Sequence, residues 1–318
     1  MALSGSLVEE EVALPAVNSV RSLSAASVLL TLASCSLAPP APRPGAAAAP
    51  DPAAAQRGEY LARAANCAGC HSHKEHGGAP FAGGKAIMTS FGAYYSRNIT
   101  PDPQHGNGAW SEADFHRALR DGVAPGGAHY FPAFPFPSFT FMTDADIADI
   151  FAYLQTQQPD PRENRAHDLP FPYDVRLTML LWRALYFEKG PLEPDPRQGA
   201  DWNRGAYLVT AVAHCADCHS PRTSLGAVDS ERRFNGGTLY GPGEKHAPNI
   251  TPDMTDGIGK WRLEDITALL KTGIPPDGDA VSAPMSEVVE GTAKLTDADR
   301  RAIAVYLKSL KPLPGKGG

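Results

Sequence analysis

The stretch Cys67-Ala68-Gly69-Cys70-His71 decides the fold, and Cys215-Ala216-Asp217-Cys218-His219 repeats its form. On a helix, positions i, i+3 and i+4 share one face, so the two thiols and the imidazole of each stretch point the same way. Two thiols on one face can bond the two vinyl groups of a porphyrin while the imidazole meets its iron. C-x-x-C-H is the attachment pattern of c-type haem. The sequence therefore predicts two covalently bound haems c, with His71 and His219 as iron ligands.

Other uses of paired cysteines fit these stretches poorly. A zinc ribbon places its two cysteine pairs roughly 15–20 residues apart, whereas Cys67 and Cys215 are 148 residues apart. A redox-active dithiol needs a βαβ setting, and neither stretch follows a strand pattern. Disulfides between neighbouring cysteines would leave both histidines unexplained.

The chain also contains an internal duplication, because landmarks around the first stretch recur in the same order around the second. The offset between matched landmarks grows only from 147 to 153 residues. Two copies of one unit, each with one haem, are therefore expected. The matched pairs are 57–61 with 204–208, 98–102 with 249–253, Trp110 with Trp261, Gly122 with Gly273, and 143–146 with 296–299.

Within each unit the pattern favours short helices joined by long loops. Helices at 56–66 and 201–214 lead into the cysteine stretches, and closing helices follow the N-caps Thr143 and Thr296, with apolar residues at helical spacing. Glycine and proline number 30 each, which is typical of turn-rich loops. No strand pattern is convincing. The predicted fold is all-α, loop-rich, with each unit wrapped around one haem.

The 318 residues correspond to about two domains, and the net charge of −6 does not favour a nucleic-acid binder. Residues 161–200 contain a helix at 175–188, which we expect to pack the two units together; contact with a membrane or a larger partner is the alternative. The predicted organisation is a leader at 1–35, a Pro/Ala-rich tether at 36–55, two haem-binding domains at 56–160 and 201–312, the connector at 161–200, and a tail at 313–318.

The N-terminal segment has the character of a secretory signal. An apolar run at 23–34 follows Arg21 and is too short to span a bilayer comfortably. It ends in Leu32-Ala33-Ser34-Cys35, which resembles a bacterial lipoprotein box, where the cysteine carries the lipid. Acidic residues at 9–11 are wrong for a leader and place the translation start near Val20. We expect export to the periplasm with a lipid anchor at Cys35; a plain signal cleaved a few residues later is the alternative.

Over about residues 56–312 the sequence resembles the dihaem cytochromes c, close to the cytochrome subunits of periplasmic and membrane-bound alcohol, gluconate and aldehyde dehydrogenases. This resemblance implies two tandem class I cytochrome c-like domains and an electron-transfer function. It implies a periplasmic dehydrogenase as electron donor and a quinone, terminal oxidase or cytochrome as acceptor. The resemblance rests on both C-x-x-C-H stretches, both Asn-Ile-Thr-Pro-Asp segments, and residues 130–136, 202–208 and 302–307.

Methionine is often the sixth iron ligand in cytochromes c and raises the reduction potential. In the second unit Met285 stands in a Pro-rich loop eleven residues before Thr296, where the loop can fold over the haem before the closing helix begins. Met285 is therefore the predicted distal ligand of the second haem. The alternative is a core methionine that fills a gap.

The first unit departs from this pattern. Many relatives have Pro-Ala-Met-Pro where this chain has Pro132-Ala133-Phe134-Pro135, and phenylalanine cannot ligate iron. We favour Met142 as its substitute, although it directly precedes the cap Thr143 and pairs with Leu295 in the repeat. His129, Met88 and an open iron face are the other candidates for this position.

Further side chains are expected around each haem. The asparagines and threonines of the repeated segments would hydrogen-bond haem propionates or fix the loop, and the tryptophans would pack on the porphyrin, donate to a propionate or be plain core. Arg222 would pair with a propionate or be solvated. The residues concerned are Asn98, Thr100, Asn249, Thr251, Trp110, Trp261 and Arg222.

The function expected from these features is electron transfer without catalysis of its own, since two haems carry the chemistry and no nucleotide-binding, metalloprotease or nucleophile motif occurs. One rival is a dihaem enzyme of the peroxidase or thiosulfate-dehydrogenase type, which needs an open or displaceable haem ligand. Because Phe134 cannot ligate iron, this rival stays open. The other rival is a free-standing periplasmic electron shuttle.

Overall fold

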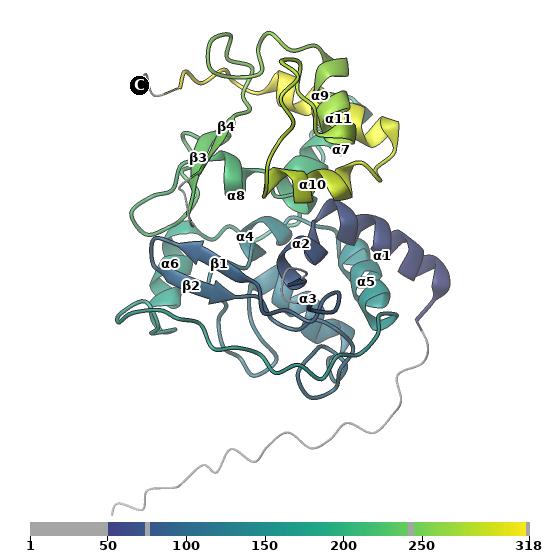
Figure 1. Ribbon diagram of the computed structural model, residues 1–318, viewed down its shortest axis with the longest axis vertical. Helices are drawn as coiled ribbons and strands as arrows, with labels where there is room; N and C mark the ends of the chain where they lie inside the picture. The colour runs from purple at the N-terminus through teal and green to yellow at the C-terminus, as the bar shows by residue number, and fades with distance from the viewer. Residues whose placement is uncertain (1–49, 74–76, 241–244, 316–318) are drawn as a thin grey trace, which may run out of the picture. The chain divides into compact units, whose positions relative to one another are not determined.

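The computed structural model describes residues 50–73, 77–240 and 245–315 (Figure 1). The predicted leader, Cys35 and residues 36–49 of the predicted tether lie outside the described residues, so export and lipid anchoring stay predictions. Across the described ranges, no helix combines the length and the apolar character needed to cross a bilayer.

Both repeats run through the same order of elements, as the duplication predicts. The connector between them contains one helix, α6 (Thr178–Tyr186), close to the predicted 175–188. The first repeat contains α1 (Pro52–Ala64), α2 (Cys67–His71), β1 (Ala86–Thr89), β2 (Gly92–Tyr95), α3 (Glu112–Asp121), α4 (Phe136–Phe139) and α5 (Asp144–Gln155). The second contains α7 (Ala200–Tyr207), a π-helical turn η2 (Leu208–Val212), α8 (Ala216–His219), β3 (Asn235–Leu239), β4 (Lys245–Asn249), α9 (Leu263–Thr272), α10 (Met285–Thr292) and α11 (Asp297–Ser309).

The expectation of an all-α fold without strands needs correction. Each repeat has a two-stranded antiparallel hairpin after its cysteine stretch, β1 with β2 and β3 with β4 (Figure 1). In register, Ala86 faces Tyr95 and Asn235 faces Asn249. The strands have only four or five residues, and β3 and β4 contain two glycines and Pro248. Strands this short and this poor in alternating apolar residues leave no readable period in the sequence.

The first and last helices of each repeat cross closely, α1 against α5 and α7 against α11 (Figure 1). A Cβ atom at Gly58 would collide with the backbone carbonyl of Asp149, and one at Gly205 would collide with that of Ala302. Glycine is therefore required at both crossings, since any side chain there would push the two helices apart. The closing helices begin at the predicted caps: Thr143 and Thr296 each accept a backbone N–H three residues on, at 3.1 Å.

The two repeats are joined by reciprocal hydrogen bonds. The hydroxyl of Tyr60, in α1, donates to Asp299 in α11 at 2.6 Å and accepts the backbone N–H of Thr296 at 3.1 Å. In the same way the hydroxyl of Tyr207 donates to Asp146 and accepts the backbone N–H of Thr143. Each opening helix thus reaches the closing helix of the other repeat, and buried side chains of both repeats belong to one apolar core.

The ion pair around Asp299 should make this junction sensitive to acid. Burial alone would raise the pKa of Asp299, but hydrogen bonds from Arg204 and Tyr60 outweigh it and lower the pKa below its ordinary value. A carboxyl with a lowered folded-state pKa stabilises the fold above its unfolded pKa of about 3.9 and loses that effect as the pH falls through the lower value. Asp299→Asn should therefore cost about 1–3 kcal/mol of unfolding free energy at neutral pH.

Urea unfolding of both proteins across the acid range checks this expectation. The deficit of Asp299→Asn should shrink as the pH falls below about 4, because the wild-type carboxyl is then protonated as well. Asp174→Asn, at an exposed site, serves as the matched control and should track the wild type at every pH. A deficit of constant size down to the acid limit would contradict the assignment.

Helix α6 contacts both repeats through a single buried side chain. The ring of Trp182 lies against Phe136 of the first repeat at 6.3 Å between centroids, and its Nε1–H donates to the carbonyl of Leu225 in the second at 2.9 Å. Trp182 is the one buried residue of α6. The connector helix thus links the units as expected. Met179 also packs against the cluster around Trp182, while the leucines of the helix are exposed.

Candidate haem-attachment sites

A sharp backbone turn precedes each cysteine stretch. Asn66, directly before Cys67, has φ +51°, and His214, directly before Cys215, has φ +39°. Left-handed backbone is uncommon for residues other than glycine. The turn ends the incoming helix and starts a new short one, α2 or α8, so the thiols and imidazole of each stretch share one helical face as predicted.

Both predicted iron-ligating imidazoles are held in the orientation that a ligand needs. Nδ1 of His71 lies 2.6 Å from the carbonyl oxygen of Arg97, and Nδ1 of His219 lies 2.8 Å from that of Pro248. A ring N–H donated to a carbonyl fixes the tautomer and leaves Nε2 with its lone pair for a metal. Burial lowers the pKa of both histidines, despite these bonds, which keeps the rings in the neutral form that binds iron.

None of the four cysteines of the stretches forms a disulfide. Burial raises the pKa of Cys67 and of Cys215 to about 12, so these thiols lack the thiolate character of a redox-active dithiol. Within the described part of the chain, no cluster of three or more His, Cys, Asp or Glu side chains is arranged to hold a metal ion. Two cysteines and one oriented imidazole per stretch fit attachment to an iron porphyrin, which supplies its own nitrogen ligands and, when bound, one-electron redox chemistry.

The repeated asparagines fix their loops. The side-chain oxygen of Asn98 accepts the backbone N–H and the hydroxyl of Thr100, at 3.0 and 2.7 Å, and its Nδ2 donates to backbone carbonyls at 160 and 162. Asn249 binds Thr251 in the same way and donates to the carbonyl of Leu313. These bonds account for the repeated segment through loop structure, and contacts of these residues with a haem stay a prediction.

The tryptophans and Arg222 differ in how they are engaged. Trp110 and Trp261 are partly buried against the core, and neither indole N–H donates to another residue that the structure describes. Both N–H groups thus remain suited to a propionate. Arg222 has a role that the sequence did not indicate, because its guanidinium donates to the carbonyl and carboxylate of Asp217, at 2.5 and 3.1 Å.

The candidate distal ligands lie in different environments. Met285 begins α10 and is partly buried, whereas the side chain of Met142, just before α5, is fully buried. Met88 is 43% exposed on β1. His129 lies in the loop beside α6, where its carbonyl accepts a hydrogen bond from Arg176 at 2.8 Å.

The two attachment stretches are brought together, which no sequence pattern indicated. Nε2 of His214 lies 3.3 Å from the carbonyl oxygen of Ala65, so the residues just before the two stretches are in contact. Lys85 donates to the carbonyl of Gly69 at 2.8 Å and pairs with Glu287 of the second repeat at 2.6 Å. Partners 202 residues apart in the chain leave no local signal, and only the folded chain makes them neighbours.

The reciprocal contact lies at the second stretch. The hydroxyl of Ser138, in α4, donates to the carboxylate of Asp217 at 3.2 Å. Burial would raise the pKa of Asp217, but the hydrogen bond of His214 and the charge of Arg222 hold it at about 2. Each stretch is therefore anchored by the segment that precedes the closing helix of the other repeat.

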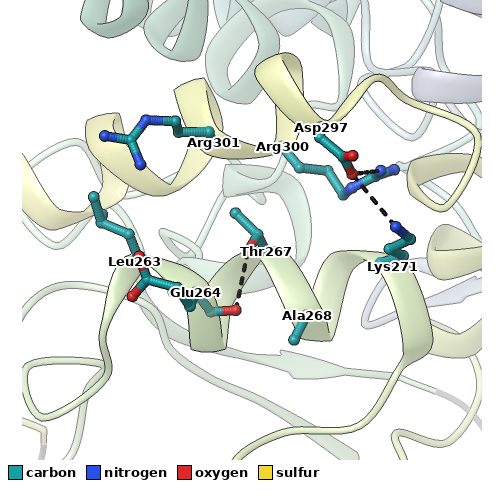
Figure 2. A pocket seen from close by; sticks show the side chains of 8 residues that line it. All are labelled: Leu263, Glu264, Thr267, Ala268, Lys271, Asp297, Arg300 and Arg301. Carbon is teal, nitrogen blue, oxygen red and sulfur yellow. Dashed lines mark hydrogen bonds and ion pairs between the residues drawn. The ribbon is translucent and has the colours of Figure 1, made fainter.

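A hollow of about 390 Å³ between α9 and α11 has a different character (Figure 2). Figure 2 shows Asp297 between Arg300 and Lys271, at nitrogen–oxygen distances of 2.5 and 3.5 Å. Three of its charged groups thus pair with each other, and its eight lining residues include no cysteine, histidine or methionine. The hollow is a surface feature of the helix pair and holds none of the predicted haem ligands.

Two matched stretches of thiols and oriented imidazoles in two like repeats define a c-type cytochrome with two haems. The cytochrome c family model matches residues 55–158 and again 203–311, and the chain belongs to the cytochrome c family. The predictions of two cytochrome c domains, two covalently bound haems c and electron transfer are confirmed.

The chain is similar to several cytochromes and dehydrogenase subunits. The chain is 39% identical over 262 residues to a dihaem cytochrome c-type protein of Cereibacter sphaeroides, and the match covers 80% of this chain and 85% of that protein. It is 39% identical over 269 residues to the fructose dehydrogenase cytochrome subunit of Gluconobacter japonicus, covering 82% and 54%. It is 40% identical over 259 residues to a nicotinate dehydrogenase subunit of Pseudomonas putida, covering 81% and 21%. The chain thus spans about half of the fructose dehydrogenase subunit and a fifth of the nicotinate dehydrogenase subunit.

Proposed function

We propose that this cytochrome is the electron-relay subunit or partner of a periplasmic dehydrogenase and passes electrons one at a time to a quinone or a terminal oxidase. The observation that carries the proposal is the contact between the two attachment stretches, through His214 and Ala65. Because each haem is bonded to its own stretch, this contact keeps the two cofactors neighbours. Names of relatives support the dehydrogenase partner, since they include cytochrome subunits of fructose and gluconate dehydrogenases. Export, with a lipid anchor at Cys35, belongs to the same proposal.

The outward face of α6 is where we place the catalytic subunit of that dehydrogenase. Large apolar side chains are exposed here, 50–71% for the leucines of this helix and its N-cap and 82% for Phe171. Contiguous exposed apolar side chains of this kind mark interaction sites. A partner docked on α6 is held against both repeats, since Trp182 contacts both. The leucines concerned are Leu177, Leu180, Leu181 and Leu185.

The charges around this face favour a protein over a membrane. Helices that lie on a membrane present Lys and Arg to the lipid headgroups. Here Arg176 donates to the carbonyl of His129 at 2.8 Å, and Arg183 donates to that of Asp121 at 2.6 Å, so both guanidinium groups are bound to the protein. Exposed Asp174 and Glu188 flank the helix and would be repelled by anionic lipid.

A double substitution on α6 tests the docking. Leu181→Glu with Leu185→Glu should weaken binding to the purified periplasmic dehydrogenase of the same organism by at least about tenfold. Reduction of the haems by that enzyme and its substrate should slow accordingly, while haem content and spectra stay unchanged. Binding by calorimetry and haem reduction by stopped-flow absorbance give the two readouts.

Ile274→Glu, at a site 49% exposed in the second repeat, is the matched control and should behave as wild type. Undiminished binding of the double variant would overturn the docking site. Loss of vesicle binding or of self-association, with dehydrogenase binding intact, would assign the α6 face to lipid or to a second copy instead. Absence of any haem reduction by the dehydrogenase would reject the relay itself.

A further inference from the structure

We infer that the first haem has no methionine ligand and binds a small exogenous ligand, such as carbon monoxide or cyanide, at its distal face beside Phe134. The inference concerns this chain's own residues and the haem that Cys67, Cys70 and His71 attach. It does not need the dehydrogenase partner.

We call the loop that follows α3 in the first repeat and the loop that follows α9 in the second the distal loops. One backbone hydrogen bond in each repeat fixes the register of its distal loop. The backbone N–H of Tyr130 donates to the carbonyl of Gly122 at 2.8 Å, and that of Val281 donates to the carbonyl of Gly273 at 2.9 Å. Both glycines end their helices, α3 and α9, in the left-handed conformation, with φ +61° and +74°. The loops therefore start from the same place with the same geometry.

From this shared bond the two loops run the same number of residues to Phe134 and to Met285. The offset between the repeats is 151 residues at each matched pair, so neither loop has an insertion relative to the other. The pairs are Gly122 with Gly273, Tyr130 with Val281, and Phe134 with Met285. Phe134 thus takes the place that Met285 has in the second repeat, and its ring packs on Tyr130 and Phe139, with centroids 5.3 and 5.7 Å apart. A phenyl ring has no lone pair to give to iron.

Met142 cannot take over, because it fills a core position of the repeat. Its counterpart is Leu295: each directly precedes the N-cap threonine of its closing helix, and each backbone N–H donates to the carbonyl three residues earlier, at 3.0 and 3.1 Å. Arg120 binds the carbonyl of Met142 at 2.6 Å, as Arg300 binds that of Leu295 at 2.5 Å. The exposed fractions of the two side chains are 0% and 3%. A sulfur enclosed by protein atoms in a leucine's position does not face a porphyrin.

Two other side chains of this loop carry possible ligand atoms and need their own variants. Tyr130 stands where the second repeat has Val281, and His129 lies one residue earlier. Both backbones are tied down, since Val123 and His129 form a bridge and Tyr130 is bonded to Gly122. The carbonyl of His129 is bound by Arg176 on the side of α6.

Spectra of the purified holoprotein test the inference. In the ferric wild type, the near-infrared charge-transfer band of methionine-bound haem should have the intensity expected for one haem, not two. After reduction, the protein should take up one equivalent of carbon monoxide. Phe134→Met should double the methionine band and lower the affinity for carbon monoxide by at least about tenfold.

Three further variants keep the outcome decisive if Phe134→Met fails to mature. Met142→Leu, which copies Leu295, should leave the methionine band and the carbon monoxide uptake unchanged. His129→Ala and Tyr130→Phe should leave the uptake unchanged as well. A wild type that binds no carbon monoxide, or a methionine band lost in Met142→Leu, would overturn the inference. Uptake of a second equivalent of carbon monoxide by His129→Ala or by Tyr130→Phe would also overturn the inference.

Discussion

Replacing Cys67 and Cys70 together by alanine will leave the protein with one covalent haem instead of two. The thioether bonds of the first haem need both thiols, and the imidazole of His71 alone does not attach a porphyrin covalently. Because the two stretches are separate units of one fold, the second haem should still be attached. Intact-mass spectrometry and the haem-to-protein ratio of the denatured protein give the readout.

The matched variant, with Cys215 and Cys218 replaced by alanine, should show the same stoichiometry but a different spectrum. It should lose the methionine band, since Met285 belongs to the second repeat, whereas the first variant should keep that band in full. Retention of two haems by either variant would contradict the assignment of the attachment stretches. Identical spectra of the two one-haem proteins would contradict the difference between the repeats.

Met285→Leu is expected to lower the reduction potential of the second haem on the order of 0.1 V, within the span of roughly 0.8 V that axial ligands cover. A thioether stabilises ferrous iron and raises the potential, and leucine has a similar volume without the sulfur. Potentiometric titration of the holoprotein should show one wave shifted and the other unchanged. Met254→Leu, at a side chain 60% exposed, is the control and should shift neither wave. Two unmoved waves in Met285→Leu would mean that Met285 is a core residue.

A difference between the two haems gives the relay a direction. If the first haem lacks a methionine ligand, as we infer, it has the lower potential, and we then expect electrons to enter there and move on to the second haem. The proposed docking face lies beside both repeats, because Trp182 of α6 lies against Phe136 in α4 and donates to the carbonyl of Leu225 in the second repeat. Because the two attachment stretches are in contact, the electron would then pass from the first haem to the second within the same protein.

Most of the chemistry could be predicted from the spacing of residues that are close in the sequence. Cys67, Cys70 and His71 share a helical face because of their positions alone, and the same holds at Cys215. The caps Thr143 and Thr296 and the repeat of landmarks were likewise readable without coordinates. In contrast, the two hairpins could not be predicted, because their strands are short and those of the second hairpin contain glycine and proline. The contact of Arg222 with the carboxylate of Asp217 could not be predicted, while its pairing with a propionate stays a prediction.

The amino-acid order by itself determined that two haems are attached, that the chain is a duplication, and that the first unit has phenylalanine where a ligand is expected, because each of these is a property of neighbouring residues. Tertiary structure decided which carbonyls orient His71 and His219, that Met142 fills a leucine's place, and that the two attachment stretches touch. The contacts of the two histidines and of the two stretches join residues 26 to 149 positions apart. Only the closing of the loops by the packed core brings such residues within hydrogen-bond distance.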